Sequence, residues 1–216
     1  MIRNWIFDWS GTLVDDMALV VCATNHVLRQ YGVAEIGREE FRKSFKLPYS
    51  DFYQEYLPGV CMEEIEAHFR YGFSISEASV PKLEYSEEFL AYIKEQGGRM
   101  FVLTSMCEIA FGEQLVDLGM EPYFERTYAG VLDKRELIGD ILQEQNLAKE
   151  ETVFVGDMTH DVDTAHHGGV WSVGVLTGYN HRKTLMSSKP SVLVNDLKEL
   201  RGLLESGSTL FTSCDE

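Results

Sequence analysis

Short apolar runs rich in β-forming residues alternate along this chain with patterns typical of amphipathic helices. Between most of the runs, apolar residues recur at three- and four-residue spacing, as do Phe111, Leu115 and Leu118. This alternation predicts right-handed βαβ units, and therefore an α/β fold in which helices cover both faces of a doubly wound parallel sheet. The strands that we expect are Trp5–Phe7, Met100–Leu103, Thr127–Ala129, Val153–Val155, Trp171–Leu176 and a weaker Val192–Val194.

The interval 16–84 departs from this alternation, because it contains helical patterns but no strong strand. Gly32 follows the first of these patterns at a position where a helix often ends. We therefore expect a small helical cap at 16–84, inserted into an α/β core made of 1–15 and 85–205. The tail, 206–216, has no periodicity, so we expect it to be flexible.

The composition restricts the partners and the location of the protein. A formal net charge of -16 would repel nucleic acid and anionic membrane surfaces, so neither is an expected partner. No apolar stretch approaches the roughly 20 residues needed to span a bilayer, and the N-terminus lacks the pattern of a signal peptide. The four cysteines are widely separated, which indicates reduced thiols. We therefore expect a cytoplasmic protein, and find no pattern that indicates its oligomeric state.

Polar side chains stand directly after several of the expected strands. Asp8 follows the first strand and opens a turn that contains Ser10, while Thr104 and Ser105 follow the second. Asp157 follows the fourth strand, and the carboxyl ends of parallel strands meet at one edge of a sheet. An aspartate there can act as a nucleophile, and hydroxyls can donate to phosphoryl oxygens, although both residue types also serve as turn and cap residues.

Two further groups carry charges that suit phosphate chemistry. Lys134 begins an amphipathic helix after the third expected strand, where its ammonium could neutralise both Asp8 and a phosphoryl group, or face solvent. Asp157 and Asp161 lie four residues apart after the fourth strand, and carboxylate oxygens are ligands that Mg²⁺ prefers. The histidines nearby form no H-x-x-x-H pair, so we expect Mg²⁺ rather than a transition metal.

The segments FDWSGTLVDD, FVLTS, Lys134 and VGDMTHD occur in this order, and together they resemble the four sequence motifs of the haloacid dehalogenase superfamily. The expected helical insert lies between the first and second motifs, where the phosphoglycolate phosphatase-like members carry a C1-type cap. The resemblance implies a Mg²⁺-dependent phosphatase that hydrolyses a small phosphorylated metabolite.

By this resemblance, Asp8 would attack phosphorus and form an aspartyl-phosphate, which water would then hydrolyse. Thr104 would bind a phosphoryl oxygen, with Ser105 beside it. Lys134 would hold the nucleophile and the phosphoryl group together.

The resemblance also implies the ligands of the metal. Asp157, the carboxylate of Asp8 and the backbone carbonyl of Ser10 would bind Mg²⁺. Asp161 would support the site or a metal-bound water. Because every residue has a backbone carbonyl, a serine at position 10 leaves that ligand in place.

Ser10 nevertheless departs from the pattern, since most phosphatases of the superfamily carry a second aspartate there as general acid and base. A serine hydroxyl has no pKa near neutrality, and general acid–base catalysis typically contributes about 10²–10⁴-fold to a rate. Three interpretations fit: a slow or specialised phosphatase, an enzyme resembling phosphonoacetaldehyde hydrolases, or a protein that binds phosphate ligands without turnover. A cap residue, His160, the substrate or bulk water could supply the missing function.

Cationic residues in the segment EEFRKSFKLPYSDFYQ offer contacts to a substrate. Arg42, Lys43 and Lys46 could bind an anionic leaving group. Phosphonoacetaldehyde hydrolases carry alanine at the position of Ser10, and a lysine of their cap forms a Schiff base with the substrate aldehyde. Lys43 and Lys46 are candidates for that lysine by location. Cap shape is not encoded in the motifs, so phosphoglycolate, a sugar phosphate and a nucleotide all remain open as substrates.

Overall fold

Six parallel strands form one sheet in the order β3-β2-β1-β4-β5-β6. The computed structural model describes residues 2–207 and 210–211. The chain builds one half of the sheet outward from β1 and then returns to build the other half from β4, which confirms the expected doubly wound α/β fold. The strands are β1 Asn4–Phe7, β2 Arg99–Leu103, β3 Arg126–Tyr128, β4 Thr152–Gly156, β5 Trp171–Val175 and β6 Val192–Val194.

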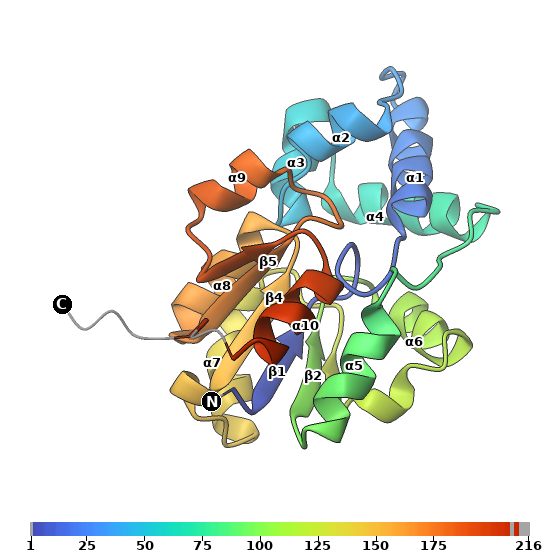
Figure 1. Ribbon diagram of the computed structural model, residues 1–216. Coiled ribbons are helices and arrows are strands. Elements are labelled where there is room, and N and C mark those ends of the chain that lie inside the picture. The colour runs from blue at the N-terminus through green and yellow to red at the C-terminus, as the bar shows by residue number, and fades with distance from the viewer. Residues whose placement is uncertain (1, 208–209, 212–216) are drawn as a thin grey trace.

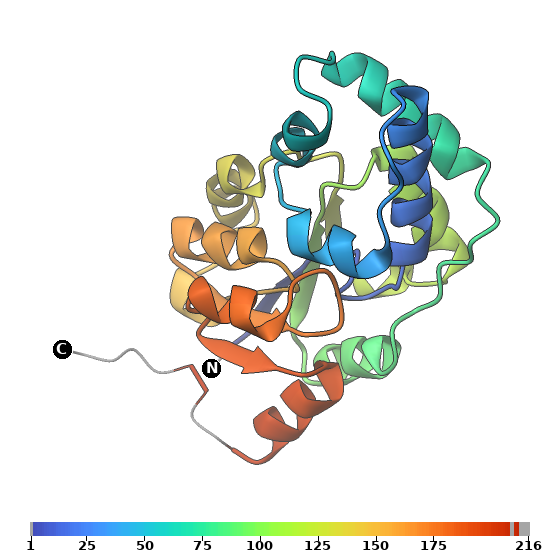
Figure 2. The ribbon, with the colours of Figure 1, turned by 90° about the horizontal axis from the view of Figure 1, so that it is seen from above.

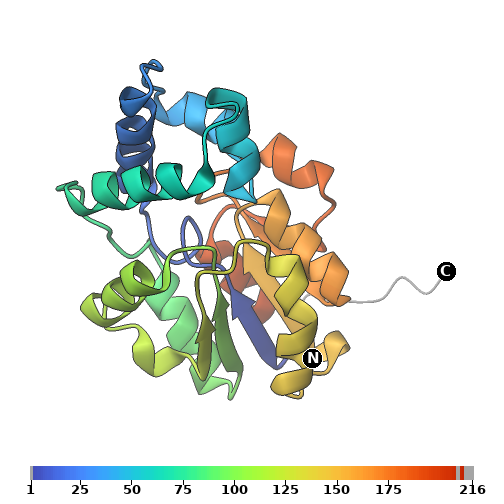
Figure 3. The same ribbon diagram turned by 180° about the vertical axis from the view of Figure 1, so that it is seen from behind.

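Helices cover both faces of the sheet, because its central strands are apolar on both sides. Phe7 points to the face covered by α5, α6 and α10, whereas Ile6 points to the face covered by α7 and α8. Figures 1 and 3 show these two layers from opposite sides. The helices are α5 Ser86–Glu95, α6 Glu108–Asp117, α7 Lys134–Glu144, α8 Thr159–Gly168, α9 Arg182–Ser187 and α10 Leu197–Glu205, with short 3-10 turns at Glu121–Tyr123 and Lys149–Glu151.

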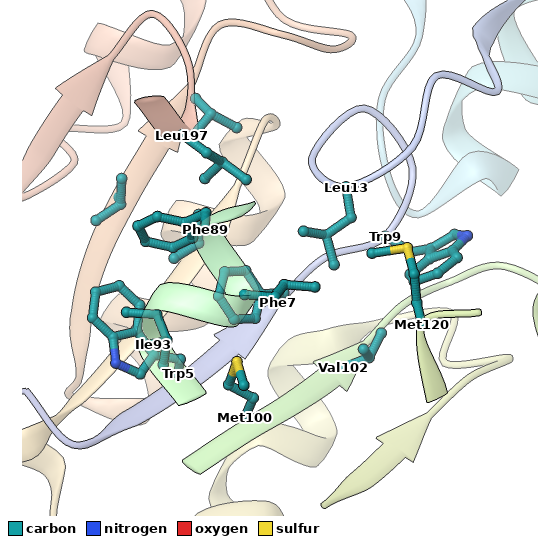
Figure 4. Packing of buried hydrophobic residues seen from close by; sticks show 14 of the residues in the cluster. Trp5, Phe7, Trp9, Leu13, Phe89, Ile93, Met100, Val102, Met120 and Leu197 are labelled. Atoms are coloured by element: carbon teal, nitrogen blue, oxygen red, sulfur yellow. The ribbon is translucent and has the colours of Figure 1, made fainter. Parts of the chain in front are cut away.

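Aromatic residues of β1 anchor the core on the first of these faces. The ring of Phe7 lies edge-on to that of Phe89 in α5, with 6.2 Å between their centroids, and Trp5 packs against the same ring (Figure 4). Trp9 extends this packing beyond the strand and is completely buried. Burial of these large rings therefore fixes β1, and with it the position of the turn that follows.

Four helices between β1 and α5 pack around an apolar cluster of their own. Phe41 and Phe52 are fully buried there, and the cluster also takes in Met158 and Tyr179 from the loops that follow β4 and β5. These helices therefore lie over the carboxyl ends of the strands, as Figures 1 and 2 show. They are α1 Met17–Gln30, α2 Arg38–Ser44, α3 Tyr49–Tyr56 and α4 Met62–Ser74, and we call them the cap helices. The boundaries of a separate domain at 16–84 stay a prediction.

The expected flexible tail, 206–216, falls mostly outside the described residues. In its described part, Leu210 and Phe211 pack against the first core cluster, and the ring of Phe211 lies 5.8 Å from that of Trp171. Among the helices that the structure describes, none has the length and apolar character needed to cross a membrane.

Candidate active site

The carboxyl ends of three neighbouring strands bring together the polar residues that the sequence singles out. Asp8 follows β1, and its backbone N–H donates to the carbonyl of Val155 in β4 at 2.9 Å. Thr104 directly follows β2, and Asp157 directly follows β4. All three residues are buried, with exposed fractions of 4%, 1% and 0% for Asp8, Thr104 and Asp157. Parallel pairing therefore places these groups at one edge of the sheet, under the cap helices.

Lys134 joins this group from the start of α7. Its ammonium lies 2.8 Å from Oδ1 of Asp8 and 2.7 Å from Oδ1 of Asp161, and its side chain is completely buried. Burial by itself lowers the pKa of Lys134, but the charges of Asp161 and Asp8 outweigh it and raise the pKa above its ordinary value. The lysine is therefore a permanent cation in the site.

Three buried carboxylates lie close together, and two of them, Asp8 and Asp161, contact this single ammonium. Oxygen atoms of Asp8, Asp157 and Asp161 lie within 4.8 Å of one another. Burial, opposed mainly by Lys134, raises the pKa of Asp8 to about 6, and burial together with the charges of Asp161 and Asp8 raises the pKa of Asp157 well above its ordinary value. An ammonium alone leaves this group with excess negative charge, so the residues fit a divalent cation with a preference for oxygen ligands.

Asp157 is fixed by donors from two other turns. Its Oδ1 accepts from Thr12 Oγ1 at 3.2 Å, and its Oδ2 accepts from the backbone N–H of Tyr179 at 2.5 Å. Gly11 and Gly178 flank the same carboxylate: a Cβ at Gly11 would lie 2.7 Å from Oδ2, and one at Gly178 would lie closer still. The turn after β1 and the loop after β5 therefore need glycines to approach Asp157.

A model of the haloacid dehalogenase-like hydrolase family matches residues 5–175, an interval that contains all four of these charged groups. The chain belongs to this family. A 5'-nucleotidase from Pseudomonas aeruginosa is 26% identical and aligns over 94% of this chain and 96% of its own length. A phosphoglycolate phosphatase from Pseudomonas putida is 24% identical over 92% of this chain and 78% of its own length.

Solved structures of low sequence identity share the fold of this haloacid dehalogenase-like hydrolase. A haloacid dehalogenase-like family protein from Streptococcus pneumoniae superimposes with a TM-score of 0.84 at 18% identity, over 94% of this chain and 98% of that one. A predicted phosphoglycolate phosphatase from Haemophilus somnus gives a TM-score of 0.79 at 19% identity, with the same coverage of both chains.

Thr104 and Ser105 directly follow β2 at the same edge of the sheet. Thr104 Oγ1 accepts from the backbone N–H of Met106 at 3.2 Å, and α6 begins only at Glu108, so Thr104 does not cap that helix. Among the described residues, the buried Oγ of Ser105 has no hydrogen-bond partner. Buried hydroxyls are rarely left unpaired, so Ser105 carries an unused hydrogen-bonding group directly after the strand edge.

Ser10 is held by Asp16, the first residue of the predicted helical insert. Its Oγ donates to Oδ2 of Asp16 at 2.5 Å, and the hydroxyl of Tyr179 donates to Oδ1 of Asp16 at 3.0 Å. Burial raises the pKa of Asp16 to about 6, although both hydrogen bonds oppose this shift. The available signal for Asp16 was its place as the last residue of the segment FDWSGTLVDD, and for Tyr179 it was the position after β5.

The predicted cationic residues of the cap helices are not gathered at the site. Arg42 Nε donates to the backbone carbonyl of Tyr179 at 3.3 Å, which places it beside the loop that holds Asp157. Lys43 is exposed, and Lys46 forms an ion pair with Glu55 on the surface of the cap helices. Among the described residues, Arg42 is the one of the three that contacts a loop of the sheet edge.

His160 has a structural contact that occupies its ring. Its Nε2 accepts from the backbone N–H of Lys134 at 3.2 Å, in a side chain that is only 3% exposed. Burial, supported by the charge of Lys134, lowers the pKa of His160 to about 4. The imidazole is therefore neutral and positions the first residue of α7.

Proposed function

We propose that this haloacid dehalogenase-like hydrolase is a Mg²⁺-dependent phosphatase that hydrolyses a small phosphorylated metabolite through an aspartyl-phosphate on Asp8. The contact between Lys134 and Asp8 carries the proposal. It holds a buried carboxylate next to a permanent cation, which can attract a phosphoryl group to the nucleophile without protonating it.

The proposed reaction has two displacements at phosphorus. A carboxylate oxygen of Asp8 forms a bond to phosphorus while the bond to the leaving oxygen breaks, and water then displaces Asp8 to release phosphate. Lys134 neutralises the phosphoryl charge in both steps. Thr104 and the unpaired hydroxyl of Ser105 offer polar contacts to the remaining phosphoryl oxygens.

The proposed metal ligands are Asp8, Asp157 and the backbone carbonyl of Ser10. Asp161 supports them, since its Oδ1 accepts from Lys134 and its Oδ2 from the backbone N–H of Met158 at 2.9 Å. When bound, Mg²⁺ would withdraw charge from the phosphoryl group and lower the pKa values of its carboxylate ligands. The three clustered carboxylates support this assignment.

We propose that residues 16–84, which contain the cap helices, form a C1-type cap. Their apolar cluster reaches Met158 and Tyr179 at the strand edge, so they cover the proposed site. A 5'-nucleotidase, a phosphoglycolate phosphatase and a pyrophosphatase are among the similar proteins, which supports a small phosphorylated substrate. We propose the same cytoplasmic location that the sequence indicates.

Phosphate release in the presence and absence of Mg²⁺ tests the proposal. We would assay 4-nitrophenyl phosphate, phosphoglycolate, pyrophosphate, nucleoside monophosphates, sugar phosphates and phosphonoacetaldehyde, with Asp8→Asn as the control. Release that requires both Mg²⁺ and Asp8 is expected, and the best substrate in the panel would identify the substrate class.

Two results would contradict the proposal in different ways. Full activity of Asp8→Asn would exclude the aspartyl-phosphate. Binding of vanadate by a wild-type chain that releases no phosphate from any substrate would indicate a phosphate-binding protein, whereas preferential cleavage of phosphonoacetaldehyde would indicate C–P bond hydrolysis.

A further inference from the structure

The proposed reaction requires two proton transfers that Ser10 cannot perform alone. The leaving oxygen must gain a proton in the first displacement, and the attacking water must lose one in the second. A serine hydroxyl exchanges its proton readily only when another group takes or supplies one. The inference that follows rests on the proposed function and concerns that second group.

Asp16 is in contact with Ser10 and does not cap the helix that follows it. Its side chain is 1% exposed, and its Oδ2 accepts from Ser10 Oγ at 2.5 Å. Asp16 occupies the residue before α1, where an aspartate commonly caps a helix, yet it makes no capping hydrogen bond. The carboxylate therefore turns away from the helix N-terminus and toward the turn that carries Ser10.

Both oxygens of this carboxylate accept hydrogen bonds from residues of the strand-edge loops. Oδ1 accepts from the hydroxyl of Tyr179 at 3.0 Å, and the backbone N–H of the same residue holds Asp157. Asp16 is also near enough to Asp8 for their charges to interact. A buried carboxylate with a hydroxyl donor on each oxygen, close to the nucleophile, is in a position to exchange a proton with Ser10.

We propose that Ser10 and Asp16 form a two-residue proton relay that replaces the single carboxylate usual in this family. A hydroxyl has one proton and two lone pairs. When Ser10 Oγ donates to Asp16, a lone pair is left to accept from the attacking water; when Asp16 carries a proton and donates to Oγ, the hydroxyl proton is left for the leaving oxygen. Ser10 is the catalytic member, and Asp16, which acts through it, is the positioning residue. His160 does not serve this role, because its Nε2 is engaged with Lys134.

The relay runs in opposite directions in the two displacements. In the first, Asp16 releases its proton to Ser10 Oγ while Ser10 passes its own proton to the leaving oxygen, as the P–O bond breaks. In the second, Ser10 Oγ takes a proton from the attacking water and passes its own to Oδ2 of Asp16. Asp16 thus ends the cycle protonated, as it began, and Ser10 is unchanged.

The dependence of rate on the leaving group tests the relay. The wild type, Asp16→Asn, Ser10→Ala and the control Asp15→Asn would be assayed on 4-nitrophenyl phosphate, whose leaving group needs no proton, and on an alkyl phosphate. Asp15 is the neighbouring carboxylate, and its backbone N–H bonds to Pro81. We expect Asp16→Asn and Ser10→Ala each to lower kcat on the alkyl phosphate by about 10²–10⁴-fold, with KM little changed.

Two further readouts separate a relay from a structural role. With 4-nitrophenyl phosphate, Asp16→Asn is expected to give a burst of nitrophenol close to the enzyme concentration, because the second displacement still needs a base. The exchanged variant Ser10→Asp/Asp16→Ser keeps a carboxylate and a hydroxyl in contact. On the alkyl phosphate we expect its kcat to be at least about tenfold higher than that of Asp16→Asn or Ser10→Ala.

The outcomes separate this inference from the proposed function. An active, Asp8-dependent wild type whose Asp16→Asn and Ser10→Ala variants keep the wild-type ratio of rates on the two substrates would overturn the relay alone. A wild type without Asp8-dependent release would overturn both. If Asp16→Asn does not fold, as judged by circular dichroism, Ser10→Ala and the exchanged variant decide the question.

Discussion

The ammonium of Lys134 lies 2.8 Å from Oδ1 of Asp8, and neither side chain is more than 6% exposed. The two residues are far apart in the sequence and meet because α7 begins at the edge of the sheet. A buried ion pair of this kind costs free energy to desolvate, and it is retained here in the middle of a group of acids. The contact therefore makes the proposed site sensitive to changes in charge.

Replacing Lys134 with methionine should destabilise the protein strongly. The substitution keeps much of the side-chain volume but leaves Asp8 and Asp161 without their buried counterion, which typically costs about 3–5 kcal/mol. We expect a lower melting temperature in EDTA at pH 7.5 and partial recovery with Mg²⁺. Lys183→Met, at an exposed position, is the control. Equal melting temperatures for the two variants would contradict a counterion role.

Magnesium should raise the melting temperature of the wild type. Binding to the folded state adds about 2.7 kcal/mol at a concentration 100 times the dissociation constant. Asp157→Asn should abolish the shift, because it removes one of the clustered carboxylates. Asp163→Asn, at an exposed position two residues beyond Asp161, should preserve it. A shift that persists in Asp157→Asn would place the metal elsewhere.

Gly178→Ala should impair the metal site without disturbing the core. The added Cβ would overlap Oδ2 of Asp157, so either the carboxylate or the loop after β5 must move. We expect weaker Mg²⁺ binding by calorimetry and a fall in kcat of at least about tenfold, in line with the cost of misplaced catalytic groups. Gly139→Ala in α7 meets no atom within 4 Å and should be neutral or slightly stabilising.

His160 should make the protein less stable as the pH falls below neutrality. Its pKa is lowered from 6.5 to about 4 in the folded protein. As the pH falls through 6.5, the imidazole is therefore protonated in the unfolded chain, but in the folded chain it stays neutral until about pH 4. His160→Gln keeps an acceptor for Lys134 without this protonation. Between pH 6.5 and 4, the unfolding free energy of the wild type, measured in EDTA, should therefore fall relative to that of the variant. Above pH 7 the difference between the two should stay constant.

Arg42 and Lys43 should differ in their effect on substrate binding. Arg42 reaches the carbonyl of Tyr179, whereas Lys43 is exposed. We expect Arg42→Ala to raise KM for the best substrate of the panel by about tenfold, the loss of roughly one charged hydrogen bond. Lys43→Ala should leave KM within about twofold. The reverse order would show that the cap helices close onto substrate in another arrangement.

The strands and the main-chain positions of the motifs followed from the sequence alone. All six expected strands are present, and their ends differ from the predicted ones by at most one residue. They were predictable because apolar runs and the helical patterns between them are local properties of the sequence. Lys134 was placed at the start of a helix, and Asp8, Thr104 and Asp157 at strand ends, by the same local reasoning. Parallel pairing then made their convergence predictable.

Contacts between distant segments could not be predicted in this way. Three hydrogen bonds depend on how the loops and cap helices pack on the sheet edge. They join Ser10 to Asp16, the backbone N–H of Tyr179 to Asp157, and Arg42 rather than Lys46 to the carbonyl of Tyr179. Periodicity determines which residues are buried in an element, but it contains no information on where a side chain of one loop meets another. The sequence by itself therefore determined the fold and the chemical groups of the candidate site, whereas only tertiary packing decided which buried carboxylate accompanies Ser10.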